Sequence, residues 1–359
     1  MAYALERIEW CEVPLVRPVP DPAWVSESAM GKSTSAAYYL TPIRWLLQGE
    51  ELMQLRVTPH VPVALSGLIG LVVAMDNSCR HCYGAFRSML KIFGYSEALI
   101  RNLEETIATN KLTRKENAAL EFARKVSRSA PRPSESDLQE LTAAGFSAIE
   151  IAEIAYLAGI NACGNRLATL LALPPDPLEE VEANWFTKLK RPFSRKDFRA
   201  AASRVFTPQY PADYSGPGRI ILDALEGSPA AAALATVLAG AWNSPVTARR
   251  VKALIFMVVA HGLNCDACEA EAAKVLRDEG WTDAEIEHLL TYLDSEKLDP
   301  LEQRVLHFAR ETVRYQTRRL QQLAQDFAKG LERNVLIEII GLIAYANALA
   351  RMSIMLHRC

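Results

Sequence analysis

The chain has 359 residues, half of them apolar, and 40 basic against 42 acidic residues give a formal net charge of -2. This composition provides enough apolar material for one large or two ordinary domains, and no long basic run is available to bind nucleic acid. Seven cysteines, of which Cys11, Cys163 and Cys359 stand alone, argue against the disulfide framework of a small secreted protein.

The N-terminal segment, "MAYALERIEWCEVPLV", lacks the basic start and apolar run of a secretory signal, so we expect a cytoplasmic protein. Residues 1–36 are interpreted as an N-terminal extension that precedes a helical unit at 37–173. Two apolar stretches, "VALSGLIGLVVAM" and "VLIEIIGLIAYANALA", are too short to span a bilayer or are interrupted by Glu338 and Asn347. They are predicted to be buried core helices, and no membrane partner is expected.

The first cysteine pair follows a predicted apolar helix that ends near Ala74. Ser78 is a good N-cap, which would place Cys79 at the first helical position and Cys82 one turn later. Unpaired amides and the positive end of the helix dipole stabilise a thiolate there. Residues three apart share a helix face with Cβ atoms about 5–6 Å apart. A disulfide needs about 3.8 Å, so a small relaxation of the first turn would close it.

Such a pair suits the reduction of peroxides. One thiolate attacks the O–O bond and becomes a sulfenic acid, and the neighbouring thiol condenses with it to a disulfide. An external dithiol must then reset the pair.

The rest of the first unit has helical periodicity. Apolar residues recur at steps of three to four, as at Leu120, Ala123 and Val126, and strand alternation is hard to find. An all-α fold with six or seven helices in each half is therefore predicted. Arg124 and Arg310, each within "FAR", are expected to form salt bridges between helices.

Residues 174–218 are rich in proline, charge and aromatic side chains without a sustained period, and they are interpreted as a linker. The second helical unit is assigned to 219–359. In it a predicted apolar helix ends near Ala260, Asn264 is the expected N-cap, and Cys265 and Cys268 repeat the spacing of the first pair.

The two units are related by a constant shift of 186 residues, which aligns Cys79 with Cys265 and Cys82 with Cys268. Roughly a third of the 57 aligned positions from residue 68 to residue 124 are identical. The chain is therefore predicted to contain two tandem units produced by internal duplication. The same shift also aligns Asn161 with Asn347, for which helix packing is the expected role, and Pro59 with Pro245.

Two other interpretations of the cysteine pairs remain open. Free cysteine is often fully buried, so the four residues could serve packing alone. A zinc ion could instead be held by all four thiols if the two halves bring the pairs together. Neither a metal nor a cofactor is part of the preferred interpretation.

Three segments carry a resemblance to a known family: "ALSGLIGLVVAMDNSCRHCYGAFRSML", "KLTRKENAALEFARKVSR" and "AGFSAIEIAEIAYLAGINACGNRLATLL". They resemble the AhpD-like alkylhydroperoxidase and carboxymuconolactone decarboxylase superfamily, particularly its peroxidase-related branch, and the second half resembles the same unit more distantly. The likeness covers most of the chain apart from the first forty residues or so and the linker. It implies an all-helical fold assembled into dimers, trimers or hexamers, with thiol peroxidase or disulfide reductase chemistry.

By this resemblance Cys82 or Cys268 would attack the peroxide, and Cys79 or Cys265 would resolve it. His81 matches a histidine found inside the motif of some members. The family's redox members also carry a glutamate twelve residues before the first cysteine and a histidine four residues after the second. Those positions hold Gly67 and Phe86 in the first unit and Ala253 and Ala272 in the second.

The usual proton relay is therefore missing from both units. His261 and Glu271 are alternative bases near the second pair, although each has an ordinary structural explanation.

The charges beside the two pairs predict which is active. The first has Arg80, His81, Arg87 and Lys91 nearby, and the second has Asp266, Glu269 and Glu271. At about 7 Å in water a unit charge shifts a neighbouring pKa by roughly 0.4 units, so the first pair is expected to hold more thiolate. The second pair is expected to close less readily as a disulfide.

The sequence thus predicts a thiol-dependent oxidoreductase that reduces hydroperoxides, with a protein or lipoyl dithiol as external reductant and a homo-oligomer, dimer or trimer, as its assembly. One alternative is a decarboxylase-like enzyme that uses a pocket without thiols. The other is a redox sensor or scaffold without turnover.

Overall fold

The computed structural model describes residues 8–11, 13–19, 36–41, 43–54, 57–105, 112–127, 132–175, 214 and 216–359. In this part of the chain there are sixteen helices and no strand, which confirms the prediction of an all-α fold. Most of the proposed extension and almost all of the proposed linker lie outside the described residues.

The helices of the first half are α1 (Ala37–Leu40), α2 (Arg44–Gln54), α3 (Val63–Asp76), α4 (Arg80–Ile92), α5 (Glu97–Glu105), α6 (Arg114–Arg124), α7 (Glu135–Ala143) and α8 (Ala148–Leu170). Those of the second half are α10 (Arg219–Ala224), α11 (Pro229–Asn243), α12 (Arg249–Gly262), α13 (Asp266–Asp278), α14 (Asp283–Tyr292), α15 (Pro300–Glu311), α16 (Thr317–Phe327) and α17 (Arg333–Met355). Each described half has more helices than expected, because short α1 and α10 precede the rest.

The two halves run through corresponding helices at a nearly constant separation. Helices α3 and α12 both have 14 residues and begin at 63 and 249, while α4 and α13 both have 13 and begin at 80 and 266. The last helix of each half, α8 or α17, has 23 residues. The spacing of apolar residues has therefore produced helices of equal length in equivalent places.

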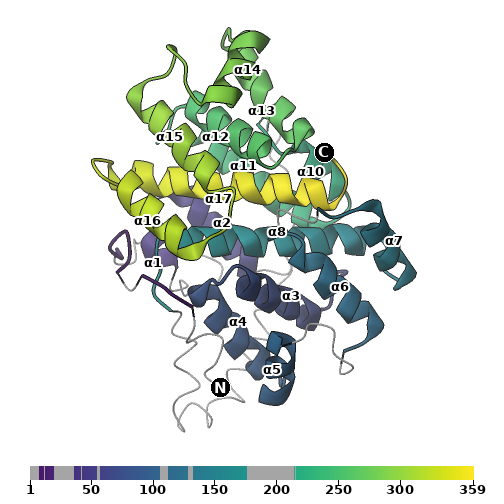
Figure 1. Ribbon diagram of the computed structural model, residues 1–359. Helices are drawn as coiled ribbons and strands as arrows, with labels where there is room; N and C mark the ends of the chain where they lie inside the picture. The colour runs from purple at the N-terminus through teal and green to yellow at the C-terminus, as the bar shows by residue number, and fades with distance from the viewer. Residues whose placement is uncertain are drawn as a thin grey trace.

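Helices α8 and α17 form the centre of the molecule. Figure 1 shows them side by side across its middle, with α3 to α6 on one side and α12 to α15 on the other. Helix α17 is long and apolar enough to cross a membrane, but 94% of its most apolar window is buried inside the protein. As predicted, "VLIEIIGLIAYANALA" in α17 and "VALSGLIGLVVAM" in α3 are core helices.

Each central helix buries one glutamate that binds groups from both halves. The carboxylate of Glu153 on α8 accepts hydrogen bonds from the His60 amide at 3.0 Å and from Ser228 Oγ at 2.7 Å. The carboxylate of Glu338 on α17 accepts from Trp45 Nε1 at 2.9 Å and from Thr247 Oγ1 at 2.7 Å. Because both carboxylates are fully buried, these bonds are needed to offset the loss of hydration, and they tie the two halves together.

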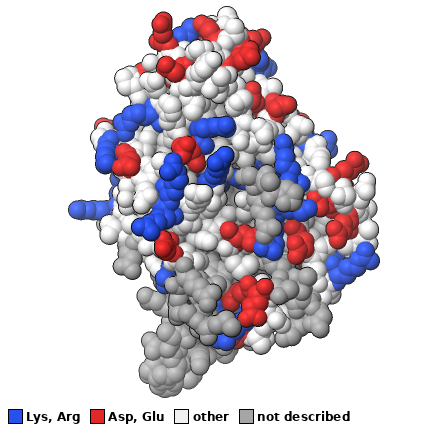
Figure 2. All heavy atoms as spheres, viewed as in Figure 1, with Lys and Arg blue, Asp and Glu red and all other residues white. Residues whose placement is uncertain are grey.

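The surface carries both signs of charge. Figure 2 shows Lys and Arg interspersed with Asp and Glu over the described part of one face, with basic residues gathered across its middle, where Figure 1 places α16 and α17.

Candidate functional site

Both cysteine pairs lie at the start of a helix, but one residue away from the predicted register. Cys79 and Cys265 are themselves the N-caps of α4 and α13. Ser78 and Asn264, the expected caps, instead have left-handed backbones with φ of 49° and 54°.

The reason is the tight turn that joins each pair of helices. The amide of Cys79 bonds back to the Ala74 carbonyl at 3.0 Å, and that of Cys265 bonds to the Ala260 carbonyl at 3.0 Å. This six-residue closure ends the preceding helix and requires a left-handed residue just before the cysteine. The cysteine is then left to cap the next helix.

The two cysteines of the first pair are not in a disulfide, and they lie in the environment expected for a reactive pair. Cys79 is fully buried, and its Sγ accepts the backbone amide of Cys82 at 3.4 Å. Cys82 is partly exposed, and the first turn of α4 contains no acidic residue. Sulfur at this position faces unpaired amides and the positive end of the helix dipole, both of which favour a thiolate.

A cavity of about 400 Å³ is lined by residues that are sequence neighbours of this pair. Two of its lining residues flank the cysteines in sequence, since Ser78 precedes Cys79 and Tyr83 follows Cys82. Thr317, from the second half, also lines it and donates its hydroxyl to the Asn77 carbonyl at 3.1 Å. The remaining lining residues are Ile8, Glu9, Met75 and Arg318. Both halves therefore contribute residues to this cavity.

His81 lies between the two cysteines and is buried. Its Nδ1 is 2.6 Å from the carbonyl oxygen of Pro174. Because a carbonyl only accepts, Nδ1 carries the proton, and a neutral His81 has its basic nitrogen at Nε2. The ring is therefore held in one orientation by the segment that follows α8.

The basic residues expected to activate the first pair are engaged by acids of α5. Arg87 bonds to Glu97 and, through Nε at 2.9 Å, to Glu104, while Lys91 bonds to Glu97 at 2.8 Å. Although burial raises the pKa of Glu97, hydrogen bonds from Lys91, Arg101 and Arg87 lower it to about 2. Carboxylates of α5 therefore pair with Arg87 and Lys91, which reduces the positive field that these two residues contribute at the first pair.

Two residues that the sequence did not single out belong to this site. The hydroxyl of Tyr83 donates to Glu104, so the residue after Cys82 joins the charged network. Tyr315, from the second half, donates to the Asn165 carbonyl at 2.9 Å. Burial raises the pKa of Tyr315, and the nearby thiols of Cys79 and Cys82 raise it further. No local motif marks either residue.

The second pair is bonded differently from the prediction. Cys265 forms a disulfide with Cys359, with Cα atoms 4.9 Å apart, and not with Cys268. The expectation that Cys359 stands alone is therefore wrong. Beyond α17, His357 has φ of 51° and the Arg358 amide bonds back to the Ser353 carbonyl at 2.8 Å, which turns the chain end toward Cys265.

Cys268 remains a thiol and is buried, with only 9% of its surface exposed. Its Sγ donates to Ser353 Oγ at 3.1 Å. Burial raises the pKa of Cys268 to about 12, against a lowering by the bond to Ser353 and with a further rise from Glu271. Cys268 is therefore protonated at neutral pH.

The two alternative bases near the second pair are bound to other groups. His261 Nδ1 lies 2.9 Å from Glu269 Oε2. Glu271 accepts the amides of Gly218 at 2.7 Å and Ile220 at 3.0 Å, and burial raises its pKa. The His261 ring and the Glu271 carboxylate are thus engaged in contacts that hold helix ends in place, which is the ordinary structural role considered for each of them.

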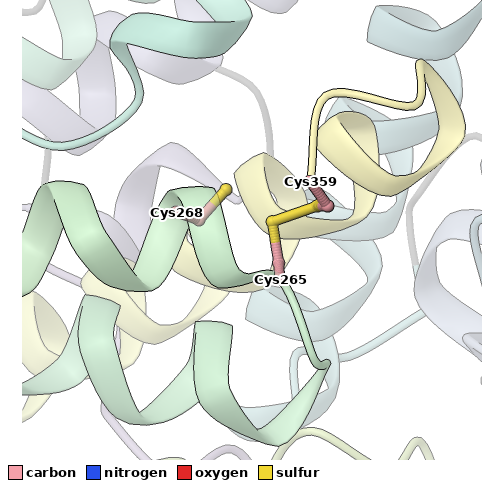
Figure 3. A group of neighbouring side chains, drawn as sticks. All are labelled: Cys265, Cys268 and Cys359. Carbon is pink, nitrogen blue, oxygen red and sulfur yellow. A yellow bond between two sulfur atoms is a disulfide. The ribbon is translucent and has the colours of Figure 1, made fainter.

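The sulfur atoms of Cys265, Cys268 and Cys359 lie within 4.8 Å of one another, and Figure 3 shows the Cys268 sulfur directed toward the disulfide. Cys79 and Cys82 do not join this group, so the described residues do not form the four-thiol zinc site considered from sequence. With the disulfide reduced, the three thiolates have the chemistry of zinc ligands.

The positions of the missing proton relay are filled by apolar packing. A Cβ on Gly67 would lie 3.1 Å from Met89 Cε and 3.2 Å from Leu90 Cδ2. Phe86 packs over Gly70, where a Cβ would lie 2.3 Å from its ring. In the second half, Ala253 and Ala272 are fully buried. These four positions therefore hold glycine or apolar residues in the described structure, and none carries a group that can transfer a proton.

The asparagines and arginines for which the sequence predicts packing or salt-bridge roles lie away from the cysteine pairs in sequence. Asn161 and Asn347 each donate to a carbonyl four residues earlier in the same helix, at 2.7 and 3.0 Å. Asn347 also donates to Thr312 Oγ1, outside its own helix, at 3.5 Å. Arg124 forms the predicted bridge between helices, with both bonds to Asp76 at 2.9 Å. Among the described residues no carboxylate is bonded to Arg310, so the same prediction is not met there. The neighbour of Arg310 is Gly262, 186 residues after Asp76.

Comparisons with known proteins do not assign the chain: neither a scan against protein-family models nor a search of curated proteins finds a match.

Proposed function

We propose that the protein is a thiol-dependent oxidoreductase that reduces hydroperoxides through Cys79 and Cys82. The observation that carries this proposal is the arrangement at the start of α4. There the sulfur of Cys79 accepts the Cys82 amide, Cys82 is partly exposed, and the residues on either side of the pair, Ser78 and Tyr83, line a cavity of about 400 Å³. The resemblance of this region to AhpD-like proteins supports the same chemistry.

In the proposed cycle the Cys82 thiolate attacks the distal oxygen of a hydroperoxide, ROOH. The O–O bond breaks, the alcohol ROH leaves after taking a proton, and Cys82 becomes a sulfenic acid. The Cys79 thiolate then attacks the Cys82 sulfur and releases water, which gives a Cys79–Cys82 disulfide. An external dithiol reduces this disulfide by exchange and is itself oxidised.

His81 is the proposed proton carrier for the first step. Its Nδ1 proton is held by the Pro174 carbonyl, so Nε2 is the nitrogen that exchanges a proton with the reacting groups.

A second candidate function is a redox sensor, and the apolar packing at Gly67 and Phe86 favours it. Without the relay carboxylate and histidine, proton transfer has fewer partners, so each oxidation would be followed by slow reset. In such a protein the Cys79–Cys82 pair would be oxidised once and would remain a disulfide.

The test is hydroperoxide consumption with a small dithiol as reductant, using the wild type, Cys82→Ser and Cys268→Ser, with Cys11→Ser as the matched control. Loss of the nucleophile should lower the rate by at least about 100-fold in Cys82→Ser. Cys268→Ser and Cys11→Ser should retain most of the activity.

Equal loss in the Cys82 and Cys268 variants would contradict the assignment to the first pair. Full activity in both would exclude a mechanism that depends on either thiol. No consumption by the wild type would favour the decarboxylase-like alternative. Stoichiometric oxidation without sustained turnover would identify the sensor.

We also propose that the halves arose by duplication and that one chain replaces two single-unit subunits in a homodimer or homotrimer. The equal lengths of α3 and α12, and of α4 and α13, support this origin. Light scattering coupled to size exclusion would measure the assembly, and a monomer at micromolar concentration would contradict it.

A further inference from the structure

The second cysteine cluster contains three sulfurs with different access to solvent. Cys265 is fully buried, Cys268 is nearly so, and Cys359 is exposed at the chain end. All three sulfurs lie within 4.8 Å of one another, with the present bond between Cys265 and Cys359 (Figure 3). The buried Cys265 can therefore bond to either a buried or an exposed partner.

One helix positions both alternative partners of Cys265. The end of α17 turns back through the bond from the Arg358 amide to the Ser353 carbonyl, which brings Cys359 to Cys265. The side chain of the same Ser353 holds the Cys268 sulfur at 3.1 Å. The Ser353 hydroxyl can rotate to donate to a Cys268 thiolate, which would stabilise that sulfur when it leaves a disulfide.

We propose that Cys265, Cys268 and Cys359 form a three-thiol exchange site in which Cys359 transfers a disulfide between the buried pair and the protein surface. This activity is separate from peroxide reduction at the first pair. In its central step the Cys359 thiolate attacks the Cys265 sulfur of a Cys265–Cys268 disulfide. The Cys265–Cys268 bond breaks, the Cys265–Cys359 bond forms, and Cys268 leaves as a thiolate that takes up one proton.

The observed bonding is the end state of that step, with the disulfide on the exposed residue and Cys268 as a hydrogen-bonded thiol. An external dithiol can then attack the Cys359 sulfur. A mixed disulfide forms and the Cys265 thiolate leaves. The second thiol of the reagent completes the exchange, releasing Cys359 as a thiol and the reagent as its disulfide. The direct route to a Cys265–Cys268 bond would require the reagent to reach buried sulfur.

The test follows disulfides in full-length protein without any peroxide, so its result does not depend on the proposed peroxidase. Fully reduced protein is oxidised with an azodicarboxamide, whose N=N bond accepts two electrons and two protons from two thiols. Samples are quenched by alkylation at increasing times and mapped by peptide mass spectrometry. The proteins are the wild type, Cys359→Ser, Ser353→Ala, and Cys11→Ser as a control for the loss of a thiol away from the cluster.

In the wild type and in Cys11→Ser a Cys265–Cys359 bond should appear first, because Cys359 is the exposed thiol that the oxidant reaches. A Cys265–Cys268 bond should then form from it by the reverse exchange and coexist with it. In Cys359→Ser the Cys265–Cys268 bond should persist, and dithiothreitol should reduce it at least about tenfold more slowly than it reduces the wild-type disulfide. In Ser353→Ala the transfer should slow because the leaving sulfur loses its donor.

Three results would overturn the proposal. The first is that the wild type forms no Cys265–Cys268 bond. This result needs no variant, so it cannot be explained by misfolding of a variant. The second is reduction of Cys359→Ser as fast as the wild type. A stoichiometric zinc ion in the purified wild type, bound to the three cysteines in place of any disulfide, would also overturn it and assign a metal site instead.

Discussion

The two cysteine pairs have the same spacing and the same place at a helix start, yet their chemistry differs because of what packs around them. Cys79 and Cys82 are not in a disulfide, Cys82 is partly exposed, and their sequence neighbours Ser78 and Tyr83 line a cavity. In the second pair Cys265 is bonded to Cys359 and Cys268 is buried as a thiol. A shared motif therefore fixes the helix cap, while distant segments decide whether the sulfur is ionised, bonded or reachable.

The largest expected difference is in the reactivity of Cys268. Its pKa of about 12, against an ordinary 9.0, means about 1000-fold less thiolate at pH 7 than the same residue has when unfolded. Alkylation of Cys268 by iodoacetamide should therefore be slower by about that factor in folded than in denatured protein. The folded rate should rise about tenfold per pH unit up to pH 12, as the thiolate fraction does.

Peptide mass spectrometry would measure the alkylation rates, with the Cys265–Cys359 bond kept intact. A folded rate within about tenfold of the denatured one at pH 7 would contradict the burial of this thiol.

The next largest effect concerns the packing of the helix that precedes each pair. Gly70 lies under Phe86 in the first half, while the positions 186 residues later hold Phe256 and Ala272, so the large and small side chains have exchanged helices. Gly70→Phe should destabilise the protein by about 3 kcal/mol or more, because the ring of Phe86 fills the space.

The double variant Gly70→Phe/Phe86→Ala copies the arrangement of the second half. Chemical denaturation should show it to be more stable than the sum of the two single changes predicts, by at least about 1 kcal/mol. Strict additivity would show that the two positions do not compensate.

A smaller effect is expected from the bridge that exists in one half alone. Asp76→Asn should lower the free energy of unfolding by about 1–2 kcal/mol, because it removes the charge from a two-bond contact with Arg124 that is largely shielded from solvent. Arg310→Gln is the matched control and should cost less than about 0.5 kcal/mol, since no carboxylate is bonded to it in the described residues. Equal losses would contradict this difference between the halves.

The smallest predicted effect comes from contacts across the halves. Thr317→Val should cost about 0.5–1 kcal/mol, because its hydroxyl bonds the Asn77 carbonyl at 3.1 Å just ahead of Cys79. Thr291→Val removes a hydroxyl bond within one helix, to the Glu287 carbonyl, and serves as the control. Thr317→Val should also change the alkylation rate of Cys82, whereas Thr291→Val should not. No change at Cys82 in either variant would show that α16 does not shape the first site.

The sequence was sufficient to predict what depends on local spacing. The all-α fold, the core helices α3 and α17, and the place of each cysteine pair at a helix start follow from apolar periodicity and short-range signals. The one-residue error at Ser78 and Asn264 arose because the left-handed turn that closes one helix displaces the cap of the next.

The remaining errors involve contacts between distant parts of the chain. Cys265 and Cys359 are 94 residues apart, and their bond depends on how the end of α17 meets α13. The acids that bind Arg87 lie on another helix, and Tyr315 reaches the first pair from the other half. These pairings are set by the packing of whole helices, so local sequence patterns carry no signal for them.

Glu153 and Glu338 each take a hydrogen-bond partner from the opposite half, at Ser228 and Trp45. If the chain were split into two polypeptides, each fragment would have to place a carboxylate in an apolar interior without one of its donors. Neither fragment should fold well alone, and mixing them should restore structure through complementation.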